Sequence, residues 1–350
     1  MRIEERTGGF TSLGEFLVKV RKACFGEGTW DSRLKTAGHM VEGEDSQGGF
    51  LVPEQWADEI YHAALETAIV RNRVAKGAII KATGDSLKIR KLVETSRVSN
   101  LFGGITFTWT QEKGEKATAI SKPALGQLEL TPHKLVGGCW VSNELESDYG
   151  KFGGFMRFAF GQALSFIEDD YFLWGSGAGV PLGALHASNG SLIPVTRNAV
   201  GLINWTDIAH MAERLLPQSW ETAVWLVNPD ALDELFEATA PAANQAAVFN
   251  LNDRKLWGIP FIITEKCQAL GAQGDIALCD FDHGHYVIAD REMLIAASRE
   301  VDYGGTGFLT DETFWKIVLR VDGQPLMNAQ ITPHRGANTL SPFIVLSATS

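Results

Sequence analysis

The sequence predicts a mixed α+β fold, and three of its features lead to this prediction. Between residues 151 and 174, apolar side chains recur at steps of three and four residues, which is typical of one long helix. After residue 201, short apolar strands and helical segments follow one another without a regular βα alternation. At about 84–132, a stretch rich in threonine, glycine and lysine has strand-like pieces but no core-sized apolar run. Because 350 residues are too many for one small core, we expect two or more lobes.

Residues 1–50 are predicted to form an N-terminal arm. Its first part is a helix over residues 11–25 that places one apolar stripe along a single face: Leu13, Phe16, Leu17, Val20 and Cys24. The following segment, GEGTWDSRLKTAGHMVEGEDSQGG, is polar and glycine-rich, and its apolar residues show little periodicity. It therefore predicts an extended arm or a linker. The folded body then opens at FLVPEQWADEIYHAALE, with Pro53 near the first turn of a helix.

The stretch at about 84–132 is too long for an ordinary loop in a compact domain. It is either disordered or packed against something outside this chain. The segment GAIIKATGDSLKIR, which runs into this stretch, predicts a strand, a Gly-Asp turn and a second strand. Trp109 lies in the stretch, and an aromatic side chain outside a core pattern suits an interface anchor as well as it suits local packing.

The second half of the chain predicts a mixed lobe. We expect a helix DIAHMAERLL capped by Thr206, a strand AVWLV and a helix NPDALDELFEA. The strands IPFIIT, DIALC and YVIAD come next. A closing hairpin is expected to join TFWKIVLRV to PLMNAQI across Asp322-Gly323, because Asp-Gly is a strong hairpin signal.

The segment FIEDDYFLWGSGAGVPLGAL combines three acids with four glycines, so it could be a phosphate cradle or simply a helix end. A dinucleotide site needs glycines that precede a helix, and Gly175 and Gly177 follow one, with Pro181 beyond them. Helix termination is therefore favoured. The consecutive acids of this segment spread over about 200° of the helix, so they do not converge on one substrate. A basic group of a partner is one way to compensate their charge.

The segment DFDHGHY is the candidate metal cluster. On a strand, Asp280 and Asp282 would share one face, while His283 and His285 would share the other. Ligands on opposite faces do not converge, so a turn between strands is favoured over a metal site. We find neither a G-x-S-x-G elbow nor a phosphate-binding loop. The sequence thus predicts no catalytic residues, no cofactor, no metal and no enzymatic activity.

Charge and hydropathy limit the partners. The net charge is −11, and residues 1–36 contribute +2 from seven Lys/Arg and five Asp/Glu, which leaves −13 on the remainder. A duplex-binding protein needs a basic stripe, so contact with DNA should be weak, non-specific and confined to the arm. Nothing approaches eighteen consecutive apolar residues, which argues against a membrane partner.

Six segments, in order, resemble the major capsid proteins of tailed bacteriophages of the Hong Kong 97 type: SLGEFLVKVRKA, GGFLVPEQWADEI, ATGDSLKIRKLVETSR, LGQLELTPHKL, LWGSGAGVPLGAL and DFDHGHYVIADR. Each piece is a weak signal alone. Their order and spacing from about residue 10 to 325 extend the resemblance over nearly the whole chain.

The resemblance implies an architecture. It implies an N-terminal arm (1–50), a peripheral domain (51–83 and 133–200, rejoined by about 310–332), an extended loop (84–132) and an axial domain (201–309). The helix at 151–174 would be the spine helix, and the loop would be a long hairpin that reaches a neighbouring subunit. Which domain residues 333–350 belong to stays open. The expected inter-subunit contacts are Trp109, Lys113, Lys116, Lys122, Phe16, Glu168 and Asp169.

The resemblance also implies a function. The chain would assemble with itself through hexamers and pentamers into an icosahedral shell around double-stranded DNA. The shell would form in the host cytoplasm and become part of the virion, with separate scaffolding, portal and decoration proteins as partners. An encapsulin-like nanocompartment shell is the alternative, and a metal-dependent hydrolase using residues 280–285 is a more remote one. Some relatives cross-link a loop lysine to an asparagine, but no lysine here matches that motif. Relatives often begin with a scaffolding segment. Only about ten residues precede SLGEF here, so we expect no such segment in this chain, and whether it was trimmed or never present stays open.

Overall fold

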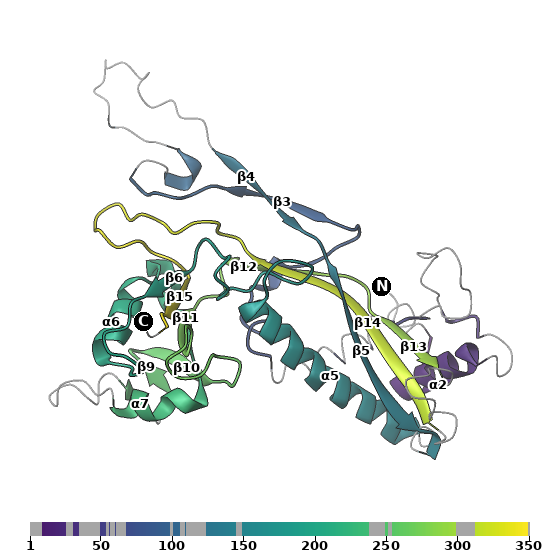
Figure 1. Ribbon diagram of the computed structural model, residues 1–350. Helices are drawn as coiled ribbons and strands as arrows, with labels where there is room; N and C mark the ends of the chain where they lie inside the picture. The colour runs from purple at the N-terminus through teal and green to yellow at the C-terminus, as the bar shows by residue number, and fades with distance from the viewer. Residues whose placement is uncertain are drawn as a thin grey trace.

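The structure is a computed structural model. It describes residues 9–25, 31–34, 50–53, 56, 60, 68–98, 101–105, 109, 124–144, 149–237, 249–250, 254–298 and 312–348. These residues form a six-stranded sheet, a seven-stranded sheet and a separate two-stranded hairpin. Figure 1 shows the long helix α5 beneath the first sheet, the second sheet beyond one end of that helix, and the hairpin projecting away from both.

The six-stranded sheet is built around the long strand β14 (Glu312–Pro325). On one side β14 pairs antiparallel with β5 (His133–Ser142), from Glu312 opposite Ser142 to Val321 opposite His133. The remaining strands are β1 (Phe50–Leu51), β13 (Leu294–Ser298), β12 (Tyr286–Asp290) and β2 (Ile79–Lys81). Only the β2–β12 pair of this sheet is parallel, among the described residues.

The helix α5 (Tyr149–Trp174) confirms the long helix predicted at 151–174. Phe152 and Met156 are buried against the sheet, and the Phe152 ring lies 5.3 Å from the ring of Trp315, centroid to centroid. The glycines beyond Trp174 confirm helix termination, since Gly177 and Gly179 have φ of +79° and +74°. The chain then folds back over the last turn, with the Ala184 amide donating to the Phe172 carbonyl at 2.8 Å.

The helix α2 (Leu13–Cys24) confirms the helix predicted at 11–25. Ser12 caps its N-terminus by accepting from the Glu15 amide at 3.1 Å. The predicted stripe is buried in the same core as Phe152 and Trp315, so this part of the arm packs on its own chain. Gly14 and Gly153 allow the two helices to touch, because a Cβ added at Gly153 would lie 2.9 Å from the Gly14 nitrogen.

The seven-stranded sheet forms the second lobe. Its order is β6 (Ile193–Val195), β15 (Phe343–Leu346), β11 (Ile276–Cys279), β7 (Val224–Val227), β10 (Ile259–Ile263), β9 (Lys255–Leu256) and β8 (Phe249–Asn250). Every residue of β7, β11 and β15 is buried. The helices of this lobe are α6 (Trp205–Glu213) and α7 (Leu232–Glu237). Asn204, not Thr206, caps α6, because Asn204 and Asp207 form a reciprocal capping box.

Strand pairing moves the expected domain boundaries. The strand β6 lies within 133–200 but pairs in the seven-stranded sheet, while β12 and β13 lie within 201–309 but pair with β14. The terminal strand β15 pairs with β11 and β6, which places its part of residues 333–350 in the second lobe. The chain thus enters that lobe at β6, leaves it after β11, and returns for one last strand.

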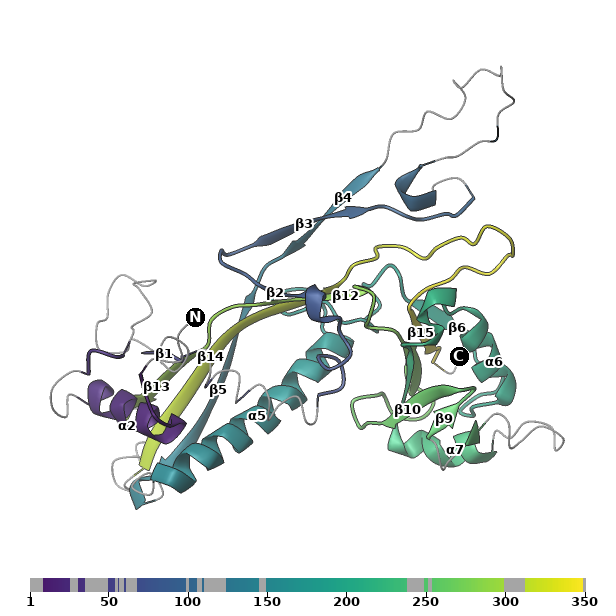
Figure 2. The same cartoon turned by 180° about the vertical axis from the view of Figure 1, so that it is seen from behind.

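The hairpin expected within 84–132 is present as β3 (Leu87–Leu92) and β4 (Leu125–Leu130), paired from Leu87 opposite Leu130 to Leu92 opposite Leu125. Its outer end projects beyond both sheets in two opposite views (Figures 1 and 2). The strands at the Gly84-Asp85 turn also exist, but β2 pairs with β12 and β3 pairs with β4. That turn therefore connects two sheets.

The hairpin expected at Asp322-Gly323 is wrong, because β14 runs straight through these residues. Asp322 is buried, and its Oδ2 accepts a hydrogen bond from the Thr131 amide at 2.7 Å. A Cβ at Gly323 would lie 2.7 Å from Tyr286 Oη. Close packing against an aromatic ring requires this glycine, so the pair is not a turn signal here.

Candidate inter-subunit surfaces and the joint between the sheets

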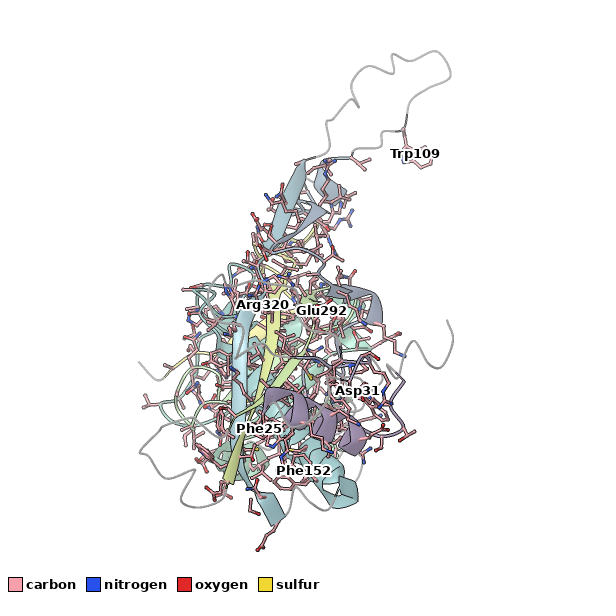
Figure 3. All side chains as sticks on the ribbon, turned by 90° about the vertical axis from the view of Figure 1, so that its right-hand side faces the viewer. Phe25, Asp31, Trp109, Phe152, Glu292 and Arg320 are labelled. Carbon is pink, nitrogen blue, oxygen red and sulfur yellow. The ribbon has the colours of Figure 1, made fainter. Side chains whose placement is uncertain are left out.

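Trp109 is the most exposed large apolar residue among those described, with a relative exposure of 105%. Figure 3 shows its side chain on the projecting part, well clear of the body. Lys113, Lys116 and Lys122 lie outside the described residues. Burying an indole ring removes a large apolar area from water, so a ring in this position is an effective anchor for a partner.

The outer half of the hairpin also exposes apolar side chains. Leu125 is 65% exposed, and Leu92, Val98 and Ile105 are exposed as well. By contrast, Leu128 and Leu130 at the base of β4 are buried in the core that contains Phe172 and Tyr286. The hairpin therefore changes from a packed base to apolar side chains that the described residues leave in water.

A second chain segment, which follows β14, binds the hairpin at the outer end of β3 and just beyond it. The Lys91 ammonium donates to the Leu326 carbonyl and to Asn328 Oδ1. The Arg97 amide donates to the Thr332 carbonyl at 2.9 Å, and the Thr332 amide donates to the Thr95 carbonyl at 3.0 Å. Partial burial lowers the pKa of Lys91. These bonds fix the direction in which the hairpin leaves the body.

The helix α5 exposes a third apolar surface. Phe155, Phe158 and Phe166 are exposed, and Phe158 reaches 63%. At 100° per residue these three positions fall on one stripe of the helix. We call Phe155, Phe158 and Phe166 the phenylalanine stripe. Such a stripe on a spine helix is a candidate contact surface.

The structure corrects three of the expected contact residues, because Phe16, Glu168 and Asp169 are buried in their own chain. Phe16 packs with the α2–α5 core. Glu168 forms a bidentate pair with Arg71, whose nitrogens lie 2.9 and 2.8 Å from the two carboxylate oxygens. Arg71 also binds Asp290, with 2.6 Å between Nη1 and Oδ2. Burial raises the pKa of Glu168 to about 6, and Arg71 opposes the shift.

Asp169 binds three donors from distant segments. Its oxygens accept from the amides of Ile69 and Val70 at 2.8 and 2.9 Å, and from Lys266 Nζ at 3.0 Å. The compensating basic groups are therefore Arg71 and Lys266 of the same chain, not those of a partner. No sequence pattern indicates them, since Arg71 lies in an aperiodic segment 97 positions from Glu168.

The segment after β11 brings together three side chains that strand geometry would separate. One ligand atom from each of Asp280, His283 and His285 lies within 4.8 Å of the others. Residues 281–285 form a turn in which His283 and Gly284 have φ of +53° and +74°. The expected turn is therefore confirmed, but the expected divergence of the ligands is wrong, because alternation of faces requires extended backbone. Burial lowers the pKa of His285, and Asp280 opposes this shift.

The body with its long helix α5, the second lobe and the projecting hairpin together have the architecture of a shell-building protein. The model of the phage capsid family matches residues 48–335, and the chain belongs to this family. It is a major capsid protein, a structural component of the virion. No curated protein matches the chain. Among the described residues, no helix is both long and apolar enough to cross a membrane.

Solved capsid structures share the fold. The capsid of a native GTA particle is 16% identical with a TM-score of 0.58, over 82% of this chain and 90% of that chain. A Microbacterium phage Oxtober96 chain is 13% identical with a TM-score of 0.53, over 90% and 95%. A Mycobacterium phage Bobi chain is 12% identical with a TM-score of 0.53, over 81% and 91%. These likenesses confirm the capsid fold expected from the sequence.

Proposed function

We propose that this capsid protein forms hexamers and pentamers that close into an icosahedral shell around double-stranded DNA. In the shell, the projecting hairpin of each subunit lies on a neighbouring subunit. The observation that supports this most directly is Trp109, a fully exposed indole on a projecting hairpin whose outer half exposes apolar side chains.

The energetics of the hairpin support a partner. An isolated two-stranded hairpin is marginal in water, and ordering each residue costs about 1–2 kcal/mol. Leu92 and Leu125, which end the pairing, are exposed, so at that end of the hairpin the described residues leave both side chains in water. A neighbouring subunit would bury it, and permanent assemblies bury more than about 2,000 Å² per interface. The phenylalanine stripe of α5 offers a further surface to be covered.

The test is a hairpin truncation. Residues 99–123 are replaced with a short Gly-Ser turn, which keeps β3, β4 and the bonds of Lys91 and Arg97 to the segment after β14. We expect a folded, soluble subunit with little change in Tm that forms no shells in sedimentation and negative-stain microscopy. Shells of normal size, or an unfolded subunit, would contradict the proposal.

A matched control lies on the same hairpin. Lys88 forms an exposed ion pair with Glu129, with 3.5 Å between Nζ and Oε1. Exposed pairs of this kind contribute about 0–1 kcal/mol. Lys88→Ala removes a charge but no apolar surface, so this variant should assemble normally. The comparison separates loss of the apolar surface from disturbance of the hairpin.

Further partners belong to the same proposal. Assembly in the host cytoplasm would involve separate scaffolding, portal and decoration proteins. With −13 on residues 37–350, the shell wall would enclose DNA without gripping it, as a genome that must later leave requires. The isolated subunit should therefore show only weak duplex binding, and tight, salt-sensitive binding would contradict this part. We also propose that the protein performs no catalysis.

A further inference from the structure

The joint between the two sheets contains an oriented carboxylate next to two imidazole rings. Asp280 directly follows β11 of the seven-stranded sheet, and His285 directly precedes β12 of the six-stranded sheet. His283 lies in the turn between them. The cluster of Asp280, His283 and His285 therefore spans the connection through which the chain passes from one lobe to the other.

The Asp280 carboxylate presents one free oxygen to the cluster. Its Oδ1 accepts from the Thr222 hydroxyl at 2.9 Å and from the Asp282 amide at 3.0 Å. Its Oδ2 is buried and has no hydrogen-bond partner among the described residues. A buried carboxylate oxygen without a partner is costly, and a bound cation is one way to satisfy it.

The distances around that oxygen suit a metal ion. Oδ2 lies 3.6 Å from His283 Nδ1 and 3.4 Å from His285 Nε2. Both separations are long for a direct hydrogen bond. Tetrahedral zinc has ligand bonds of about 2.0–2.2 Å, which places its ligands about 3.3–3.6 Å apart. The two separations therefore match the edges of such a tetrahedron.

The local backbone produces this convergence. His283 has a left-handed φ of +53°, which non-glycine residues seldom adopt, and Gly284 follows with +74°. The His285 amide closes the turn by donating to the Asp282 carbonyl at 2.9 Å. The two rings come to lie 6.0 Å apart, centroid to centroid. His283 is 44% exposed, so an ion has access from solvent.

We propose that Asp280, His283 and His285 form a site for one divalent transition-metal ion, with zinc as the best fit, and that this ion braces the joint between the two lobes. Two imidazoles and one carboxylate form a ligand set typical of zinc. The bonds from Thr222 and Asp282 to Oδ1 act as outer supports that orient the carboxylate. The site is independent of the proposed assembly function.

The experiment titrates the purified, metal-free subunit with Zn²⁺ by calorimetry and with Co²⁺ by visible absorption. The wild type should bind one ion per subunit, and Co²⁺ should give the absorption bands of a tetrahedral site. His283→Ala, which removes an exposed ligand, and Asp280→Asn should each weaken Zn²⁺ binding at least about tenfold. Zn²⁺ should also raise the Tm of the wild type and not that of His283→Ala.

The matched control is His334→Ala, which removes an exposed histidine outside the cluster. This variant should bind Zn²⁺ as the wild type does. If Asp280→Asn fails to fold, His283→Ala decides the result alone. The proposal is overturned if the wild type binds no stoichiometric Zn²⁺, or if His283→Ala binds it with unchanged affinity.

Discussion

Lys266 Nζ lies 3.0 Å from Asp169 Oδ2, and this buried ion pair ties the loop after β10 to the last turns of α5. The indole of Trp174 reinforces the connection by donating to the Lys266 carbonyl at 2.7 Å. The second lobe is thus attached to the spine helix at one end of that helix, where Figure 1 shows the two parts meeting. Forces on one lobe of an assembled subunit would pass to the other through this contact.

The first prediction concerns Asp169. Asp169→Ala leaves two amide donors and the Lys266 ammonium without their buried acceptor. Breaking a buried pair in this way costs about 3–5 kcal/mol. We therefore expect the free energy of unfolding of the subunit to fall by about that amount in urea denaturation. Asp170→Ala, at the half-buried adjacent position, should change it by less than about 0.5 kcal/mol, and equal losses would contradict the assignment.

The second prediction concerns pH. Burial raises the folded-state pKa of Glu168 to about 6, above its ordinary value of 4.5. Between these values the folded state binds more protons than the unfolded state, so this group's contribution is present below about pH 4.5 and is lost as pH rises through 6. Its size is about 2 kcal/mol. Glu168→Gln should therefore remove a fall in stability between about pH 4.5 and 6, and parallel stability curves of the wild type and the variant would contradict this prediction.

The third prediction compares two adjacent glycines in α5. A Cβ at Gly153 would lie 2.9 Å from the backbone of α2, whereas a Cβ at Gly154 meets nothing within 4 Å. Gly154→Ala should stabilise the subunit by about 0.5–1 kcal/mol, as expected for glycine in a helix interior. Gly153→Ala should destabilise it by about 1–3 kcal/mol through overpacking. Thermal denaturation of the two variants checks this, and similar Tm values would mean that the helices do not touch there.

Regular patterns made much of the fold predictable. The periodic apolar positions of α2 and α5 and the apolar runs of β7, β10, β11 and β12 identify those elements directly. The hairpin at 84–132 was predicted from the family resemblance, because composition alone did not distinguish a disordered segment from one packed against a partner. At Asp322-Gly323 the usual turn signal misled, because the glycine is there to admit the ring of Tyr286.

The buried charge networks were not predictable from the sequence. Arg71 meets Asp290 across 219 positions, and neither residue lies in a motif. The adjacent acids near the end of α5 were expected to contact a partner, yet Glu168 and Asp169 are buried in their own chain. Two left-handed residues, His283 and Gly284, decide whether the cluster after β11 converges. The alternation of side chains in a strand applies to extended backbone only, so it does not predict such a turn.

The last prediction concerns the exposed ring of Trp109. Trp109→Ala removes the most exposed apolar side chain of the described residues without touching a core, so the free subunit should keep its Tm. Truncating an anchoring tryptophan typically costs about 2 kcal/mol or more of binding free energy. The protein concentration needed for half-maximal assembly, followed by light scattering, should therefore rise by about tenfold or more. Trp109→Phe keeps an aromatic ring at the site and should recover most of the loss. Unchanged assembly of Trp109→Ala would show that the ring packs only locally, and a lowered Tm of the free subunit would point to the same conclusion.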